Sequence, residues 1–525
     1  MRTIYILAIL ICLLTACAAP IASPTSITTS PPTEAPFASR ETLTGEWLGG
    51  FTKSDGSVAS LSLNFDEANL TIEPQTKPWP LTIAPQDDEN IHFTVTGKTG
   101  EDFEQIDFTG SLSNGILTGD LNWDGQTSSI TFNPIYAIDS ALLENYTGVY
   151  RFESGRALSV IQSPNFEANG LSFFHQGLTI TDFESGDSRG LYPLDDFTFA
   201  IGALRVVGAP LSGRVQFISD DPGQAIGLMW WDKFDGITPS AESGQYAARV
   251  NYSTEDVAFT SADGAVMAGL LTSPETSQPY SAFMMLHGSE PGVKDGFGQQ
   301  VLAHYMISQG IALLTYDKRG VGDSEGGYSE SANASNINLI ASDAVAGADY
   351  LSTRPEIDPA KIGLIGGSQA GWVIPIAAAQ SDKVSFFVIN SGPVISFAQE
   401  DRYSSVTNDG DSATTYDAEK LDQTLREMQP SGVDPIPVIA ELTQPGLWLW
   451  GSVDKSVPAK VSAENLQAII DSGKSNFSYV ILPNGDHNLN ESAHGYFAEI
   501  PYAPRVLYFS KLTEWLEQNN LTQKE

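Results

Sequence analysis

Residues 363–372 (GLIGGSQAGW) hold the pattern that decides the fold of the larger part of this chain. An apolar run leads into Ser368, the neighbours of this serine are small, and a helix-forming segment follows at once. A strand that passes through a short turn into a helix is the unit of a parallel sheet with crossover helices. The sequence after residue 250 repeats this unit, with strands predicted at 282–286, 312–316, 362–365, 386–390, 447–450 and 479–482, and helices at 299–307, 339–351, 372–380, 459–470 and 505–518.

The turn around Ser368 resembles the nucleophile elbow of α/β hydrolases, whose pattern is Gly-x-Ser-x-Gly. Ala370 stands where the last glycine of that pattern is usual, and Gly371 follows one place later. The resemblance implies an α/β-hydrolase fold over residues 250–525, with a mostly parallel eight-stranded sheet and flanking helices. It also implies that Ser368 is a nucleophile.

An acid and a histidine follow the serine in the order that this fold demands. Residues 447–458 (LWLWGSVDKSVP) form a strand and a loop that presents Asp454, and residues 479–488 (YVILPNGDHN) present His487 in the same way. A serine hydroxyl needs a general base, so the predicted catalytic residues are Ser368, Asp454 and His487. Asp486 is the rival acid and His494 the rival base. Because the base must be neutral, we expect the rate to fall below about pH 6.5.

Two further loops resemble parts of the same family. Residues 283–292 (FMMLHGSEPG) are similar to its oxyanion loop, which implies that the backbone N–H groups of Ser289 and Gln369 form the oxyanion hole and that His287 braces the loop. Residues 316–324 (YDKRGVGDS) resemble the Asp-x-Arg-Gly-x-Gly-x-Ser loop, which shapes the floor near the site without a catalytic step. Of the other histidines, we interpret His92, His175 and His304 as structural.

Upstream of the hydrolase-like part, short alternating runs indicate strands. Residues 61–65 and 91–95 have an apolar residue at every second position, and Asp-Gly and Asn-Gly pairs mark turns between such runs. The sequence predicts two small all-β modules, a sandwich or barrel at 43–136 and a second module at 143–246. The two open alike, with LTGEW at 43–47 and YTGVY at 146–150.

The first residues are typical of an exported protein. Arg2 precedes the apolar run 4–14, which is too short to span a bilayer comfortably, and residues 14–17 (LTAC) resemble a bacterial lipobox. That resemblance implies a signal peptide at 1–16, acylation of Cys17, and a lipid-anchored protein of the cell envelope, in the inner or the outer membrane. The Pro-, Ser- and Thr-rich residues 17–42 then form a flexible tether. An ordinary secretory signal remains the alternative.

Composition excludes several other functions. The chain of 525 residues has 27 Lys and Arg against 64 Asp and Glu, a formal net charge of -37, so nucleic-acid binding is excluded. Its only cysteines are Cys12 and Cys17, so neither a cysteine nucleophile nor a thiolate zinc site is expected. The remaining histidines and acids lack metal-ligand spacing, and we expect no metal or cofactor. The oligomeric state is left open.

The predicted substrate is a small-molecule ester. Residues 392–444 form an insert where family members carry a cap, and this cap is polar and acidic, with apolar residues at helical spacing at 418, 421, 425 and 428. These features favour hydrolysis of carboxylic esters of short acyl chains through an acyl-enzyme intermediate. One alternative is a serine peptidase of the acyl-aminoacyl or dipeptidyl type, whose hydrolase domain is similar, although no propeller repeat precedes it here. Another is a non-catalytic binding lipoprotein of the envelope.

Overall fold

The computed structural model describes residues 43–523 with the exception of several short segments. These are 53–57, 73–77, 85–90, 100–101, 114, 164–166, 169–170, 173–176, 204–210, 221–222, 233–243 and 497–506. The described residues belong to one compact unit, Ser39–Glu525. The predicted signal peptide, Cys17, the tether and His175 lie outside the described residues.

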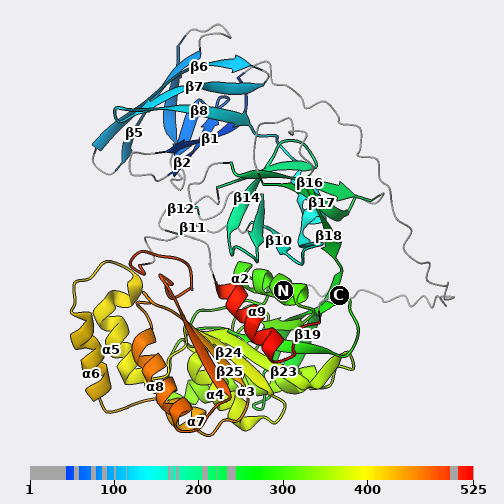
Figure 1. Cartoon of the computed structure of the whole chain (residues 1–525), viewed down its shortest axis with the longest axis vertical. Coiled ribbons are helices and arrows are strands. Elements are labelled where there is room, and N and C mark those ends of the chain that lie inside the picture. Colours follow the sequence, from blue (N-terminus) through cyan, green and yellow to red (C-terminus); the bar gives the residue numbers. More distant parts are fainter. Residues whose placement is uncertain are drawn as a thin grey trace, which may run out of the picture. The chain divides into compact units, whose positions relative to one another are not determined.

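The N-terminal part of the described chain folds into two closed β-barrels (Figure 1). In the first, each strand pairs antiparallel with the next and β1 also pairs with β8, so that the described strands close into a ring. Its strands are β1 (Glu46–Thr52), β2 (Val58–Asn64), β3 (Asn69–Ile72), β4 (Trp79–Ile83), β5 (Ile91–Thr99), β6 (Asp102–Ser113), β7 (Ile116–Trp123) and β8 (Gln126–Pro134).

The second barrel follows α1 (Ser140–Leu143) and the short helix η1 (Glu144–Tyr146), and it closes where β9 pairs with both β10 and β18. Its last strand continues to Val250, past the predicted module end at 246, because that stretch still pairs with β9. A two-stranded ribbon, β11 (Glu167–Ala168) with β12 (Leu171–Ser172), lies apart from the barrel sheet. The barrel strands are β9 (Gly148–Phe152), β10 (Ala157–Gln162), β13 (Leu178–Asp182), β14 (Ser188–Pro193), β15 (Thr198–Gly202), β16 (Gly213–Ser219), β17 (Ala225–Trp231) and β18 (Gln245–Val250).

Side chains fill the interiors of both barrels. In the first, Phe93 and Phe108 stack with ring centroids 4.7 Å apart, and Phe132 meets Phe108 edge to face. In the second, Tyr146 stacks on Phe217 at 4.5 Å. The alternation read from the sequence therefore marks inward-facing positions, and the expectation of two all-β modules is confirmed.

The C-terminal part contains an eight-stranded sheet in the order β19-β20-β22-β21-β23-β24-β25-β26. β20 is antiparallel to both neighbours, and the strands from β22 to β26 are parallel, as predicted for the fold class. The strands are β19 (Tyr252–Thr260), β20 (Val266–Pro274), β21 (Tyr280–Leu286), β22 (Ala312–Tyr316), β23 (Ile357–Gly367), β24 (Phe386–Asn390), β25 (Gly446–Gly451) and β26 (Phe477–Leu482).

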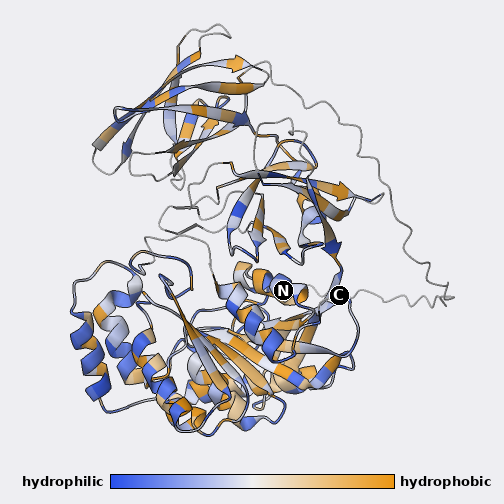
Figure 2. Cartoon of the chain, in the orientation of Figure 1, coloured by the Kyte–Doolittle hydropathy of each residue, from blue (hydrophilic) through white to orange (hydrophobic). Residues whose placement is uncertain are grey.

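Helices cover both faces of this sheet. Alternate residues of β24 show the division: Phe387 and Ile389 pack with α3, α4 and α8 in one cluster, and Phe386 and Val388 pack with α2 and α9 in another. Figure 2 shows the sheet strands as mostly apolar and α6 as mostly polar. The helices are α2 (Phe297–Ser308), α3 (Ala334–Ser352), α4 (Ala370–Gln380), α5 (Phe397–Thr407), η2 (Asn408–Gly410), α6 (Ala418–Glu427), α7 (Ile436–Ile439), α8 (Ala459–Asp471) and α9 (Tyr508–Gln518).

His304 on α2 joins this domain to the second barrel. Its Nδ1 lies 2.7 Å from the Ser159 hydroxyl on β10, and its Nε2 lies 3.0 Å from the Tyr252 hydroxyl. Burial lowers the pKa of His304 to about 4, so the ring is neutral near pH 7. His304 is a structural residue here. In the described part of the chain, no helix is both long and apolar enough to cross a membrane.

Candidate active site

Ser368 occupies the turn between β23 and α4 in a strained backbone conformation. Its φ of 53° lies in the left-handed region that non-glycine residues seldom adopt. The turn is fixed on both sides, because the N–H of Ser368 donates to the Asn390 carbonyl (3.0 Å) and the N–H of Gly371 donates to the Ser368 carbonyl (2.8 Å). A Cβ on Gly366 would lie 2.7 Å from the Ala370 side chain, which explains why small residues surround the serine.

His487 and Asp454 meet at the ends of two neighbouring parallel strands. His487 Nδ1 lies 3.0 Å and 3.1 Å from the two carboxylate oxygens of Asp454. The carboxylate is also held by the backbone N–H groups of Ser456 (2.8 Å) and Val457 (2.9 Å). A ring whose Nδ1–H donates to a carboxylate keeps Nε2 as its proton acceptor, which is the tautomer that a general base requires.

Close packing of the two loops makes this pair possible. Gly451 lies directly against the backbone carbonyls of Gly485 and Asp486, where a Cβ would clash. Asp486 makes a different contact: its carboxylate accepts the N–H of Asn490 (2.8 Å), and it is fully buried. The rival acid thus stabilises the histidine loop, and Asp454 is the acid that contacts His487.

Ser368 and His487 line one pocket of about 400 Å³. Ser289, the proposed oxyanion residue, lines it too, and Gln369 follows the serine as the first residue of the α4 N-terminus. The rival base His494 is exposed and is not among the residues that line this pocket. Much of the wall is apolar and comes from two strands, two helices and the histidine loop: Met285, Leu286, Val301, Leu302, Ile365, Leu489, Tyr508 and Phe509.

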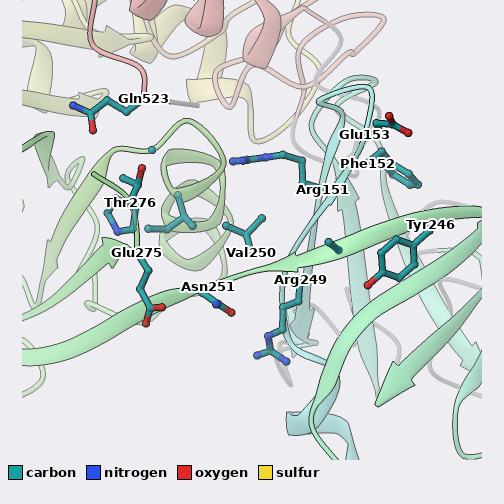
Figure 3. Close-up of a pocket in the computed structure, with 14 residues that line it drawn as sticks. Arg151, Phe152, Glu153, Tyr246, Arg249, Val250, Asn251, Glu275, Thr276 and Gln523 are labelled. Atoms are coloured by element: carbon teal, nitrogen blue, oxygen red, sulfur yellow. The ribbon is translucent and has the colours of Figure 1, made fainter. Parts of the chain in front are cut away.

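A second hollow, of about 570 Å³, lies where β18 leads into β19 (Figure 3). Arg151, Arg249 and Glu275 are among its described lining residues, which include neither a serine nor a histidine. It therefore lacks the serine and histidine that the sequence motifs predict for the active site. The chemistry expected from the sequence belongs to the smaller pocket.

The electrostatics of the pocket favour a protonated histidine in the free protein. Burial opposes the charge on His487, but the Asp454 carboxylate, its hydrogen bond and the charges of Asp409 and Asp486 outweigh burial and raise the pKa of His487 to about 9. The sequence-based expectation that the rate falls below about pH 6.5 assumed the ordinary pKa of a histidine. The raised pKa of His487 instead predicts that the rate falls below about pH 9.

The cap supplies two of the acids near the pocket. Asp409, in η2 after α5, lines the pocket, and burial together with Asp409 raises the pKa of Glu400 to about 8. The cap also holds the acid loop, because the Tyr403 hydroxyl donates to the Asp454 carbonyl (2.7 Å). Leu421 and Leu425 of α6 are buried, as their spacing predicted. The sequence motifs did not identify Asp409 or Asn390 as pocket residues, because nothing in their spacing relates them to Ser368.

The two remaining loops form a scaffold beside the site. His287 Nε2 donates to the Tyr316 carbonyl (2.6 Å), which fits the expected bracing role. Arg319 pairs with Asp343 through two contacts and with Asp263 at 2.8 Å. Burial opposes the charge of Glu290, but the hydrogen bond and charge of His287 hold the pKa of Glu290 down to about 2. Among the described residues, no group of three His, Cys, Asp or Glu side chains could hold a metal ion.

A comparison of the sequence with known protein families gives a match that agrees with the observed strand order and the strained serine turn. Residues 298–507 match the prolyl oligopeptidase family. The C-terminal domain is a serine hydrolase of the α/β class. Within this hydrolase domain, the matched range includes Ser368, Asp454 and His487.

Individual relatives are more distant. A polyketide transferase of Penicillium crustosum is 36% identical over 19% of this chain and 32% of its own length, so the match spans about a third of that enzyme. An uncharacterised protein of Mycobacterium tuberculosis is 27% identical over 56% of this chain and 91% of its own length. An esterase structure from Pyrococcus furiosus aligns over 51% of this chain and 93% of its own, at 16% identity and a TM-score of 0.37.

Proposed function

We propose that the hydrolase domain cleaves carboxylic esters of short acyl chains through an acyl-enzyme intermediate. The observation that carries this proposal is the hydrogen-bonded pair of His487 and Asp454 in the same pocket as Ser368, whose backbone is strained. In this scheme, His487 takes the proton of the Ser368 hydroxyl as that oxygen attacks the ester carbonyl, and Asp454 stabilises the imidazolium that forms.

The second half of the reaction uses the same groups. His487 gives its proton to the leaving alcohol, and water then attacks the acyl-enzyme with His487 again as the base. The backbone N–H groups of Ser289 and Gln369 are the proposed donors to the tetrahedral oxyanion. Such a donor is worth roughly 3 to 4 kcal/mol of transition-state stabilisation.

The size and lining of the pocket support a small substrate. Its volume of about 400 Å³ is near the lower end of the range of about 300 to 1,000 Å³ for ligand pockets. The cap above it is polar on its outer faces, and Leu421 and Leu425 are used in packing against Ile395, Tyr403 and Val461 rather than exposed to lipid. A lid for emulsified long-chain lipid would expose more apolar surface.

The test uses the full mature chain from Ala18, without the proposed lipid, on p-nitrophenyl acetate, butyrate and palmitate. We expect turnover of acetate and butyrate, little turnover of palmitate, and loss of all activity in Ser368→Ala. The half-buried Ser352 on α3 provides a matched control, because it does not line the pocket, and Ser352→Ala removes one hydroxyl but should leave the rate unchanged. Equal or faster turnover of palmitate would contradict the short-chain proposal.

The family match supports a second candidate, a serine peptidase of the acyl-aminoacyl or dipeptidyl type. The matched family is that of the prolyl oligopeptidases, and the carboxylate of Asp409, which lines the pocket, is suited to pair with the ammonium group of a peptide. A panel of fluorogenic aminoacyl, acyl-aminoacyl and dipeptidyl amides separates the two candidates. A kcat/KM on any of these amides above that on p-nitrophenyl butyrate would favour the peptidase.

We further propose that the protein is exported and anchored to the cell envelope by a lipid on Cys17. The support is the lipobox-like sequence at 14–17 and the Pro- and Ser-rich residues that follow it. The expected result is incorporation of a fatty-acid label into the membrane-bound protein. In Cys17→Ala the label should be absent and the protein should leave the membrane fraction, and a labelled Cys17→Ala variant would contradict the anchor.

A further inference from the structure

Lys318 is a buried cation beside the pocket to which the proposed reaction assigns no role. It lies in the loop after β22 with only 2% of its surface exposed. Burial lowers the pKa of Lys318 to about 8, and the charge of Glu290 opposes that effect. A buried ammonium group is unfavourable unless hydrogen bonds compensate for its lost hydration, so the partners of Lys318 indicate its purpose.

The Lys318 ammonium contacts both loops that carry the proposed oxyanion donors. Its Nζ donates to the Gly288 carbonyl at 2.6 Å and to the side-chain carbonyl of Gln369 at 3.3 Å. Gly288 precedes Ser289 in the loop after β21, and Gln369 follows Ser368 after β23. One side chain therefore connects two segments that are far apart in the sequence.

The contact with Gly288 determines where the N–H of Ser289 points. The carbonyl of Gly288 and the N–H of Ser289 belong to one planar trans peptide unit and point to opposite sides of it. When Lys318 holds the carbonyl, the N–H is directed the other way and cannot rotate by itself. The ammonium charge also polarises this peptide, which makes its N–H a better donor to an anion.

Neighbouring hydrogen bonds fix the peptides on either side. The N–H of Gly288 donates to the Glu290 carboxylate (3.1 Å), and the Tyr328 hydroxyl donates to the Ser289 carbonyl (2.7 Å). Tyr328 also contributes its ring, whose centroid lies 5.5 Å from Lys318 Nζ. These contacts hold the two flanking peptides, and Lys318 holds the Gly288–Ser289 peptide between them. The N–H of Ser289 is therefore the donor that Lys318 orients.

The second donor is held in a similar way. The N–H of Gln369 shares a peptide unit with the Ser368 carbonyl, which accepts the N–H of Gly371 at 2.8 Å. The Gln369 side chain bridges Lys318 to the Glu330 carbonyl, to which its amide nitrogen donates at 3.0 Å. The position of Gln369 relative to Ser289 thus depends on the Lys318 contact.

We propose that Lys318 is a positioning residue of the oxyanion hole: it orients and polarises the Gly288–Ser289 peptide and ties it to Gln369, so that the two N–H groups converge on one point. This inference rests on the proposed acyl transfer at Ser368 and assigns a function to a residue that makes no contact with substrate. It requires an effect on transition-state binding that exceeds any effect on substrate binding.

The test compares Lys318→Met, Lys318→Arg and the control Lys361→Met in the full mature chain. Lys361 is a suitable control because its Nζ also donates to a backbone carbonyl, that of Asn520 at 2.8 Å, but it does not line the pocket. The measurements are kcat and KM on p-nitrophenyl butyrate, inhibition by an alkyl trifluoromethyl ketone that forms a tetrahedral adduct on the serine, and the thermal unfolding midpoint.

We expect Lys318→Met to lower kcat by about 10- to 100-fold, below the full loss of a donor, with KM within about twofold. The affinity for the trifluoromethyl ketone should fall in proportion to kcat/KM. Lys318→Arg keeps the charge and should recover a large part of both, and Lys361→Met should match the wild type in all three measurements.

Two results would overturn the inference. One is a folded Lys318→Met variant with unchanged kcat and inhibitor affinity. The other is a loss that appears equally in KM, or that Lys318→Arg does not relieve at all while its unfolding midpoint stays at the wild-type value. Failure of the proposed function is a different result, because the wild type would then lack esterase activity or Ser368→Ala would retain it.

Discussion

Two buried charge centres of the hydrolase domain look alike in the sequence and differ in the structure. In the pocket, Asp454 holds His487 through Nδ1, and His487 lines the same pocket as Ser368. In the loop that follows β22, Arg319 forms ion pairs with both Asp343 and Asp263. Both centres come from loops that resemble family motifs. A motif that brings charges together is therefore not by itself evidence of chemistry.

The two centres differ in whether a polar atom is left that can act on a substrate. The guanidinium of Arg319 is committed through its Nε and both terminal nitrogens, and Asp343 is fully buried behind it. Such a centre can only fix the loop that follows β22. The His487 centre uses Nδ1 for orientation, and His487 itself lines the pocket, so that its other ring nitrogen is the candidate for proton transfer.

The largest effect on kcat is expected from a substitution that disrupts the Asp454–His487 pair in the pocket. Asp454→Asn keeps the shape of the side chain but removes the charge that selects the His487 tautomer, so kcat should fall by about 10⁴-fold. The matched control is Asp486→Asn, the neighbouring buried acid whose oxygen accepts the N–H of Asn490. It should lower kcat by less than about 10-fold, because one amide oxygen can still accept that bond. Stopped assays with p-nitrophenyl butyrate measure both, and equal losses would contradict the assignment of Asp454.

The next largest effect, on the free energy of unfolding, is expected from a substitution that disrupts the Arg319 ion pairs. Arg319→Met leaves Asp343 buried without its cation, which should cost about 3 to 5 kcal/mol of unfolding free energy. The folded fraction should nevertheless keep a kcat within about 10-fold of the wild type, because Arg319 does not line the pocket. Urea unfolding and active-site titration of the same sample separate stability from catalysis. A stable but inactive Arg319→Met variant would show that the two centres are not separate in role.

The same contrast shows how far the sequence predicts the site. Ser368, Asp454 and His487 each stand at the end of an apolar strand, and parallel strands bring their carboxyl ends to one edge of a sheet, so their meeting was predictable. The closure of the two barrels was not, because alternation alone does not distinguish a sandwich from a barrel. The loop that contains Lys318 was expected near the site, but the contacts of Lys318 were not, and Asp409 was missed as a pocket residue. They reach it through loop and cap geometry, which leaves no periodic signal in the sequence.

The smallest expected effect tests how the cap acts on the pocket centre. Since His487 must be neutral to act as a base and its pKa is raised to about 9, kcat/KM should rise with pH through about 9. Asp409 is one of the charges that raise this value, and it is exposed in η2, within the cap. Asp409→Asn should therefore lower the pKa of His487 and move the limb to lower pH, by less than about one unit because solvent screens an exposed charge.

The cap helix α5 offers a control for that shift. Asp401 is exposed on α5 and is not among the main causes of the raised His487 pKa, so Asp401→Asn should leave the limb in place. The measurement is kcat/KM on p-nitrophenyl acetate from pH 6 to 10, corrected for the spontaneous hydrolysis of the ester. A limb that stays fixed in Asp409→Asn, or a wild-type limb near pH 6.5, would mean that the cap acids do not act on His487. The two charge centres would then differ in geometry alone and not in their electrostatic coupling to the cap.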